Sequence, residues 1–116
     1  MKDLDRIIHE PARLRILTIL SSIDVADFNF LCNTLGLTKG NLSSHMDRLE
    51  REGYVEINKT FNGKVPHTEF KLSDDGRNAL QDYWAGIDAI RSMTVTEEAD
   101  DVVEESGDQD EGQSNA

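Results

Sequence analysis

The sequence contains a single cysteine, Cys32, in a chain of 116 residues. One thiol cannot form a disulfide within the chain, so a reducing compartment such as the cytoplasm is the expected location. Long apolar runs are also absent, since no stretch approaches the roughly 20 residues that a membrane helix requires. The first residues mix both charge signs and lead into no secretory signal segment. We therefore expect no membrane partner.

Motifs for catalysis and metal binding are equally scarce. The sequence has no glycine-rich phosphate loop and no His-Glu pair with the spacing of zinc proteases. His9, His45, His67 and Cys32 do not cluster into metal-ligand spacing. The sequence predicts no catalytic site, no metal site and no cofactor. Cys32 lies on an apolar stripe, which favours a core position, and a redox role is the alternative.

Positive charge is missing from the last part of the chain. Residues 97–116 contain nine Asp or Glu and no Lys or Arg, which is typical of a disordered acidic tail. We therefore expect one domain over residues 1–93 and a tail over residues 94–116. Residues 1–96 hold 12 basic and 14 acidic side chains, a net charge of -2, against -11 for the whole chain. The overall charge thus says little about what the folded part binds.

Hydrophobic period and helix-breaking residues divide the folded part. A short apolar helical face is expected near the N-terminus (Leu4, Ile7 and Ile8). Pro11 suits the first position of a second helix, which runs to about Ser22. Its apolar residues nearly encircle it, so this helix should be central or shared with a second subunit.

Two further helices are predicted by their caps. Asp27 suits the N-cap of a helix that stops at Gly36, and Thr38 suits the N-cap of the next, which Gly53 ends. The buried stripe of this fourth helix is expected to be Leu42, Met46 and Leu49. Helix, tight turn and helix follow one another here.

After Gly53 the period changes from 3.6 to 2, which indicates strands. Two short strands are predicted around Asn62-Gly63, a strong hairpin signal, and Pro66 should make the returning strand irregular near its tip. Ser73 then suits the N-cap of a last helix. That helix carries more apolar surface than so small a core requires: Leu80, Tyr83, Trp84, Ile87 and Ile90.

This order is that of a winged helix-turn-helix: a mainly α (α+β) fold of four to five helices with a two-stranded β-hairpin wing. Three segments, "HEPARLRIL" (9–17), "LGLTKGNLSSHMDRLEREGYVE" (35–56) and "KTFNGKVPHTEFKLSDDGRNAL" (59–80), give the chain its resemblance to a known family. The sequence resembles the small bacterial and archaeal winged-helix regulators grouped near the MarR and ArsR repressors. The paired-cysteine metal signature of some ArsR-type sensors is absent. The resemblance implies a dimeric transcriptional regulator that binds double-stranded DNA.

The recognition helix, about residues 38–52, has an outer face that suits DNA. With the buried stripe inward, 100° per residue places Gly40 and Ser44 outward and Ser43 on a shoulder. These small residues would let the helix enter a major groove roughly 12 Å wide, while the wing, residues 59–68, reaches the adjacent minor groove or backbone. The DNA-binding candidates are Thr38, Lys39, Gly40, Asn41, Ser43, Ser44, His45, Arg48, Lys59, Asn62, Lys64 and His67.

Simpler explanations exist for some of these residues. Arg48 and Glu52 have salt-bridge spacing, so Arg48 is a candidate for a surface ion pair as well as for DNA contact. His45 lies beside the buried stripe, where a structural role and a DNA contact are equally plausible. Asp47 points outward and is best interpreted as a solvated carboxylate, with a bond to a cytosine amino group as the alternative.

A homodimer is expected in which the first, second and last helices form the two-fold interface. The candidate interface residues are Leu4, Ile7, Ile8, Tyr83, Trp84, Ile87 and Ile90. An effector site between subunits is compatible with the sequence, which does not identify a small-molecule effector. The alternative function is a winged-helix protein-protein interaction module acting through the acidic tail and the last helix, and Asp47 and Glu50 on the recognition helix favour it modestly.

Overall fold

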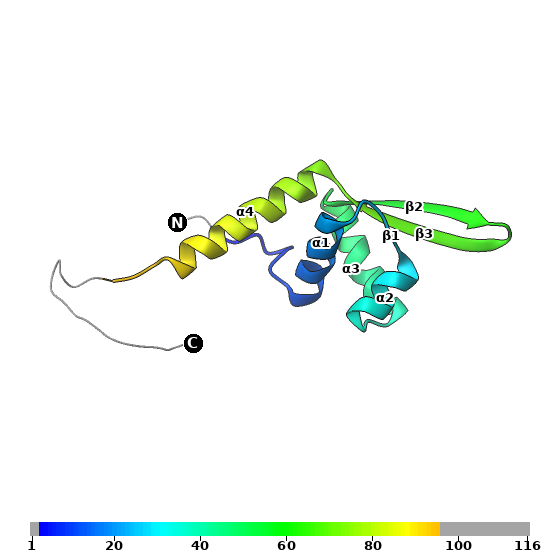
Figure 1. The fold of residues 1–116 in the computed structure, drawn as a ribbon, viewed down its shortest axis with the longest axis horizontal. Helices are drawn as coiled ribbons and strands as arrows, with labels where there is room; N and C mark the ends of the chain where they lie inside the picture. Colours follow the sequence, from blue (N-terminus) through cyan, green and yellow to red (C-terminus); the bar gives the residue numbers. More distant parts are fainter. Residues whose placement is uncertain (1–2, 96–116) are drawn as a thin grey trace.

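The computed structural model describes residues 3–95 of the chain. Its elements are α1 (Pro11–Ser22), β1 (Ala26–Asp27), α2 (Phe28–Leu35), α3 (Lys39–Arg51), β2 (Val55–Asn62), β3 (Val65–Leu72) and α4 (Asp74–Arg91). Helices α1 to α3 cluster beside the base of the sheet, and the β2-β3 hairpin and α4 extend from this cluster in opposite directions (Figure 1). The expected α+β winged helix is confirmed, with four helices in the described residues. Of the predicted acidic tail, residues 94–116, only residues 94 and 95 are among those described, and the rest lies outside them.

The segment before α1 is not the short helix that the apolar spacing predicts. The Asp5 carboxylate accepts the backbone N-H of Ile7 at 2.8 Å, and the Asp5 carbonyl accepts the N-H of His9 at 2.8 Å. These bonds form one capped turn, which does not continue because Pro11 has no N-H to donate to the Ile7 carbonyl, and that carbonyl accepts Arg13 Nε instead. The chain therefore turns here, and Ile8 is fully buried all the same.

Helix α1 has the predicted bounds and the predicted central place. Pro11 occupies the start of the helix, where its missing N-H is not needed, and the Glu10 side chain caps the helix by accepting the N-H of Arg13 at 2.7 Å. Its buried residues are Ile16, Leu17 and Leu20. Because α1 packs against α2, α3, α4 and β3, it organises the core.

The helix-turn-helix forms as its caps predict. Asp27 accepts the N-H of Phe30 at the start of α2, and Gly36 ends that helix in the left-handed conformation with φ 66°. Thr38 caps α3 by accepting the N-H of Asn41 at 3.1 Å. Leu42, Met46 and Leu49 are the buried residues of α3, as expected. The outer face of α3 is thereby fixed.

The wing is longer than the sequence predicts, and its turn is shifted by one residue. Strands β2 and β3 have eight residues each, and Asn62 pairs with Val65, so the two-residue loop is Gly63-Lys64 rather than Asn62-Gly63. Gly63 takes the left-handed conformation, φ 68°, that such a turn requires. The predicted irregularity at Pro66 is absent, since Pro66 lies within β3 and pairs in register with Phe61 of β2.

The sequence interpretation missed a third strand. The two residues of β1 pair antiparallel with Phe70 and Glu69, which gives the sheet order β1-β3-β2. This pairing covers the edge of β3 only at its base. The rest of that edge, where Pro66 lies, is free of β1, and an edge tolerates a residue without an N-H.

Helix α4 begins against the end of α3. The Ser73 hydroxyl accepts the N-H of Gly76 at 2.9 Å and donates to the Gly53 carbonyl at 2.6 Å. The Ser73 N-H donates to the Tyr54 carbonyl at 3.0 Å. The predicted cap at Ser73 is thus confirmed, with Asp74 and Asp75 in the first turn where they complement the helix dipole.

The core lies between the helical cluster and the base of the sheet. Its buried residues are Ile8, Ile16, Leu17, Leu20, Ala26, Leu31, Leu42, Met46, Leu49, Val55, Phe70, Leu72, Leu80 and Tyr83. No charged residue within 3–95 is buried. Cys32 is half-buried and packs against this core, in agreement with the structural interpretation of its apolar stripe.

Candidate nucleic-acid interface

The outer face of α3 is open to solvent along its first half. Lys39, Gly40, Asn41, Ser43 and Ser44 are all exposed. The N-H of Asn41 is bonded to the Thr38 hydroxyl, which leaves the first-turn donors before it without partners inside the helix. Free N-H groups at a helix N-terminus attract a phosphate. This face therefore combines donors, small side chains and one cation.

No packing contact inside the described residues requires a glycine at position 40. A Cβ built at this glycine would meet no atom within 4 Å. Glycine within a helix is about 1 kcal/mol less favourable than alanine, so the position carries a cost that the core does not explain. The close approach of an external molecule does explain it.

Carboxylates are absent from the first half of this face, and the exposed Asp47 and Glu50 follow in the second half of α3. Residues 28–46, which include α2 and the first half of α3, contain Lys39 and no Asp or Glu. Residues 57–68 contain Lys59 and Lys64 and again no Asp or Glu. In a chain with 23 acidic residues, two such stretches are informative because they meet in space.

A cleft of about 370 Å³ separates α3 from the wing. Lys39 lines it from α3, Phe28 and Asn29 from the start of α2, and His67 and Thr68 from β3. The carboxylate of Asp27 at its edge accepts the N-H of Phe30 and caps α2. The cleft thus brings the two carboxylate-free stretches side by side.

The predicted wing residues do not share one face. Side chains alternate between the two faces of a strand, and paired residues lie on the same face. Lys59 therefore lies on the face that continues from the core residues Val55 and Phe70, while Asn62 and His67 lie on the opposite face. Lys64 lies in the turn.

His67 and Arg48 differ in how far other groups engage them. His67 Nε2 lies 2.9 Å from the Glu69 carboxylate on the same face of the hairpin. Arg48 is exposed, and within residues 3–95 it forms no ion pair with Glu52, although their spacing allows one. Arg48 is thus available to a ligand, while His67 has a partner within the wing.

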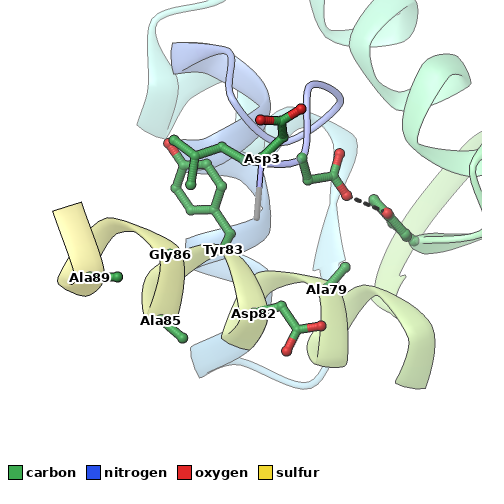
Figure 2. Close-up of a pocket in the computed structure, with 10 residues that line it drawn as sticks. Asp3, Ala79, Asp82, Tyr83, Ala85, Gly86 and Ala89 are labelled. Atoms are coloured by element: carbon green, nitrogen blue, oxygen red, sulfur yellow. Dashed lines mark hydrogen bonds between the residues drawn. The ribbon is translucent and has the colours of Figure 1, made fainter. Parts of the chain in front are cut away.

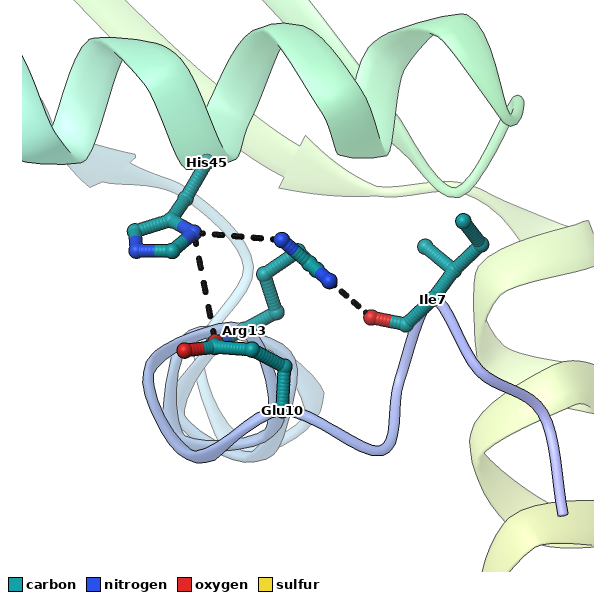
Figure 3. A network of polar contacts seen from close by, with 4 residues as sticks. All are labelled: Ile7, Glu10, Arg13 and His45. Atoms are coloured by element: carbon teal, nitrogen blue, oxygen red, sulfur yellow. Dashed lines mark hydrogen bonds and ion pairs between the residues drawn. The ribbon is translucent and has the colours of Figure 1, made fainter.

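His45 points from α3 toward the first turn of α1 rather than to the outer face (Figure 3). Its Nδ1 lies 3.4 Å from a guanidinium nitrogen of Arg13 and 3.9 Å from the carboxylate of Glu10. Arg13 also donates from Nε to the Ile7 carbonyl at 2.6 Å. Since a guanidinium can only donate, Nδ1 of His45 accepts. A structural role and a DNA contact were equally plausible for His45 from the sequence, and this geometry supports the structural role.

Arg13 and Glu10 connect three segments, and the sequence interpretation missed them. Glu10 caps α1, and Arg13 contacts both the N-terminal segment and α3. The signal for Glu10 was available, since an acceptor directly before a proline at the helix start suits an N-cap. No local pattern indicates the contact of Arg13 with His45, because these residues are distant in sequence.

A second groove, of about 630 Å³, lies between the N-terminal segment and α4 (Figure 2). One wall is formed by Asp3 and Leu4, and the other by α4 residues such as Asp82 and Gly86. A Cβ at Gly86 would lie 2.7 Å from Leu4 Cδ2, so the small residue permits this close packing. The groove adjoins residues that the sequence places in a dimer interface.

The predicted interface residues differ in exposure. Ile8 and Tyr83 are buried within the single chain, so their side chains offer no surface to a partner. Leu4, Ile7 and Ile87 are partly buried against the core. Trp84 is 41% exposed and Ile90 is 45% exposed. Helix α4 therefore supplies the exposed apolar surface.

Tyr54 joins the end of α3 to the N-terminal segment. Its hydroxyl donates to the Asp5 carboxylate. Burial of the ring, together with this hydrogen bond, raises the pKa of the Tyr54 phenol well above its ordinary value. Tyr83 makes a similar contact on the other side, since its hydroxyl lies 2.8 Å from Nδ1 of His9.

Within residues 3–95, no three His, Cys, Asp or Glu side chains lie close enough to hold a metal ion. No helix in this part of the chain has both the length and the apolar content of a membrane-spanning segment.

Comparisons with known proteins agree with this architecture. The chain is 37% identical over 79 residues to an uncharacterised protein of Methanocaldococcus jannaschii, covering 67% of this chain and 85% of that protein. It is similar to the structure of a transcriptional regulator homologue from Pyrococcus horikoshii, with 31% identity, a TM-score of 0.71, and coverage of 75% and 86%. CouR, a transcriptional repressor bound to a 23-mer DNA duplex, has the same fold at 20% identity, with a TM-score of 0.61 and coverage of 77% and 70%.

The match to a family model is the most direct of these findings. The model described as "Winged helix DNA-binding domain" matches residues 12–90, from α1 into the last turn of α4. It confirms the expected DNA-binding regulator and gives no support to the alternative of a protein-interaction module. The chain therefore belongs to the winged helix DNA-binding domain family.

Proposed function

We propose that the protein is a homodimeric transcriptional regulator of the cytoplasm that binds a specific sequence of double-stranded DNA. Helix α3 enters the major groove and the wing contacts the adjacent minor groove or its phosphates. The observation that carries this proposal is the meeting of the two carboxylate-free stretches, residues 28–46 and 57–68, at the cleft beside Lys39.

The roles of the α3 residues follow from their positions. Asn41, Ser43 and Ser44 are short and exposed, so their hydrogen-bonding groups reach base edges once the helix backbone is close to the DNA. Lys39 and the free N-H groups of the first turn bind phosphate, and Arg48 binds the backbone further along the helix. His45 acts through α1 and leaves the direct contacts to its neighbours.

The exposed apolar surface of α4 supports the proposed homodimer. Trp84 and Ile90 are large apolar residues that the single chain leaves open. A two-fold pair of such helices presents two α3 helices to one side of the duplex, with half-site centres about 34 Å apart. CouR, a repressor of the same fold, was solved on a DNA duplex, and this supports the proposed partner.

A salt titration of binding to a pool of random duplexes, followed by sequencing of the retained DNA, tests the proposal. We expect affinity to fall steeply with salt, because phosphate contacts release counterions, and we expect a palindromic consensus. A folded dimer that retains no DNA at about 50 mM salt would contradict the function.

Single substitutions test which face binds. Lys39→Ala and Arg48→Ala should each weaken binding across sequences and reduce the salt slope by about one, since each removes a phosphate contact. Lys71→Ala is the matched control, because Lys71 is exposed on the sheet face opposite the helices and pairs across the strand with Glu56. If both test variants behave like this control, α3 is not the DNA-binding element.

A further inference from the structure

The tip of the wing carries apolar side chains that the core does not use. Phe61 is 71% exposed and Val65 is 64% exposed. Phe61 pairs across the hairpin with Pro66, so both lie on one face. An aromatic ring at this position gains nothing from folding, because most of its surface stays in water.

The pairing register shows which way Phe61 faces. Val55 pairs with Leu72 and Ile57 with Phe70, and the side chains of these pairs point to the core. Two residues further on, Lys59 pairs with Thr68, and two further still, Phe61 pairs with Pro66. Since alternate residues share a face, Phe61 extends the face on which the helices pack.

Helices α1 to α3 lie toward that side of the sheet, and the hairpin extends well beyond them (Figure 1). Pro66, the partner of Phe61, lines the cleft beside Lys39 of α3. By the register, Phe61 therefore projects on the side of the sheet toward which α1 to α3 lie, while Val65, which pairs with Asn62, lies on the opposite face.

Charge around the tip selects its partner. Lys59 shares the face of Phe61, and Lys64 lies in the turn, three residues after Phe61. No carboxylate occurs between residues 57 and 68. Duplex DNA offers a groove with phosphates on both sides, which matches an apolar ring flanked by two lysines.

We propose that Phe61, supported by Pro66, enters the minor groove beside the major groove that α3 occupies and wedges against a base step, while Lys59 and Lys64 bind the flanking phosphates. This inference rests on the proposed function and adds to it an apolar contact that determines sequence preference. Apolar side chains in a minor groove partly unstack a base step and bend the duplex, and pyrimidine-purine steps yield most easily. The wing thus favours such a step.

The apolar contact has a salt signature of its own. Phe61→Ala should weaken binding to the selected operator about tenfold, as expected for loss of an aromatic contact to bases, and should leave the salt slope unchanged. Lys64→Ala should instead reduce the slope by about one. Thr60→Ala is the matched control, since Thr60 is exposed at the neighbouring position on the opposite face. Because Phe61 is largely exposed, its replacement should not alter folding.

Fluorescence of 2-aminopurine in the operator reports unstacking directly. The probe replaces an adenine just outside each half-site, where the wing lies. Its emission should rise when the wild-type protein or the Phe61→Trp variant binds, and should stay low with Phe61→Ala at a protein concentration that saturates the DNA.

The outcomes separate the two proposals. If the wild type binds DNA, Lys39→Ala weakens it, and Phe61→Ala changes neither affinity nor emission, the wedge is wrong while the proposed function stands. If the wild type binds no DNA, both are wrong. If Phe61→Ala changes the sedimentation of the free protein, the tip contacts a second copy, and the wedge is again overturned.

Discussion

Gly76 lies in the first turn of α4, directly against Tyr54, which comes shortly after the end of α3. A Cβ at this position would collide with the Tyr54 carbonyl oxygen and lie 2.9 Å from Leu72 Cδ1. The carbonyl belongs to the backbone and cannot rotate away. We expect Gly76→Ala to lower the free energy of unfolding by about 2–3 kcal/mol in urea denaturation, as overpacking does. A variant as stable as the wild type would show that this corner can shift.

Gly40 gives the opposite expectation, and so serves as the matched substitution. Since a Cβ there meets no atom within 4 Å, Gly40→Ala should raise the free energy of unfolding by about 0.5–1 kcal/mol. It should also weaken DNA binding, because the methyl group holds the helix backbone away from the groove. Greater stability together with full DNA affinity would contradict the close approach at this residue.

Tyr54 predicts a loss of stability at alkaline pH. The raised pKa means that the folded state keeps the Tyr54 proton when the unfolded chain has released it. Stability from this group is therefore complete below the unfolded pKa of about 10 and declines as pH rises above it. Urea denaturation between pH 9 and pH 11 should show a smaller decline for Tyr54→Phe, and equal declines would refute the assignment.

The N-terminal segment, α1 and α3 meet at one side chain, Arg13. It donates to the Ile7 carbonyl and lies within reach of His45, so its loss leaves two acceptors without a partner. We expect Arg13→Ala to lower the free energy of unfolding by about 1–3 kcal/mol. Arg15→Ala on the same helix is the control, because Arg15 is exposed and its removal should change stability by less than about 0.5 kcal/mol. Similar effects of the two would contradict the bridging role.

Elements whose signals are local were predictable from the sequence. The caps Asp27, Thr38 and Ser73 bond to backbone groups three residues away, so sequence alone contains both partners. Strand β1 is different, because two residues are too few to show a period and the strand exists only through its pairing with β3. The prediction of a helix around Asp5 was wrong because the apolar spacing suits a helix, whereas Pro11 interrupts the backbone hydrogen bonds after one turn.

The features of the candidate site also differ in whether the sequence predicts them. The outer face of α3 follows from its period, and the structure places the expected residues there. The division of the wing into two faces follows from the alternation of side chains along each strand, and the one-residue shift of the turn leaves it unchanged because it moves each partner by two residues. The orientation of His45 toward Arg13 depends on how α1 crosses α3, and no sequence pattern contains that.

At the scale of the whole molecule, the proposed dimer makes Trp84 the first residue to test. Trp84 is a large exposed side chain on α4, and aromatic residues of this kind dominate interface energetics. We expect Trp84→Ala to shift the protein toward monomer in sedimentation velocity at micromolar concentration. Affinity for a palindromic site should fall toward that for a single half-site. Gln81→Ala, at an exposed polar position of the same helix, should leave both properties unchanged.

The hydrogen bonds that Ser73 makes with Gly53, Tyr54 and Gly76 also have a mechanical consequence. They connect the residues after α3 to the start of α4, so we expect the two helices to move together. In the proposed dimer, the crossing angle of the paired α4 helices would then set the separation of the two α3 helices. In the proposed dimer, a molecule that spreads the α4 pair should therefore change which half-site spacing the protein can span.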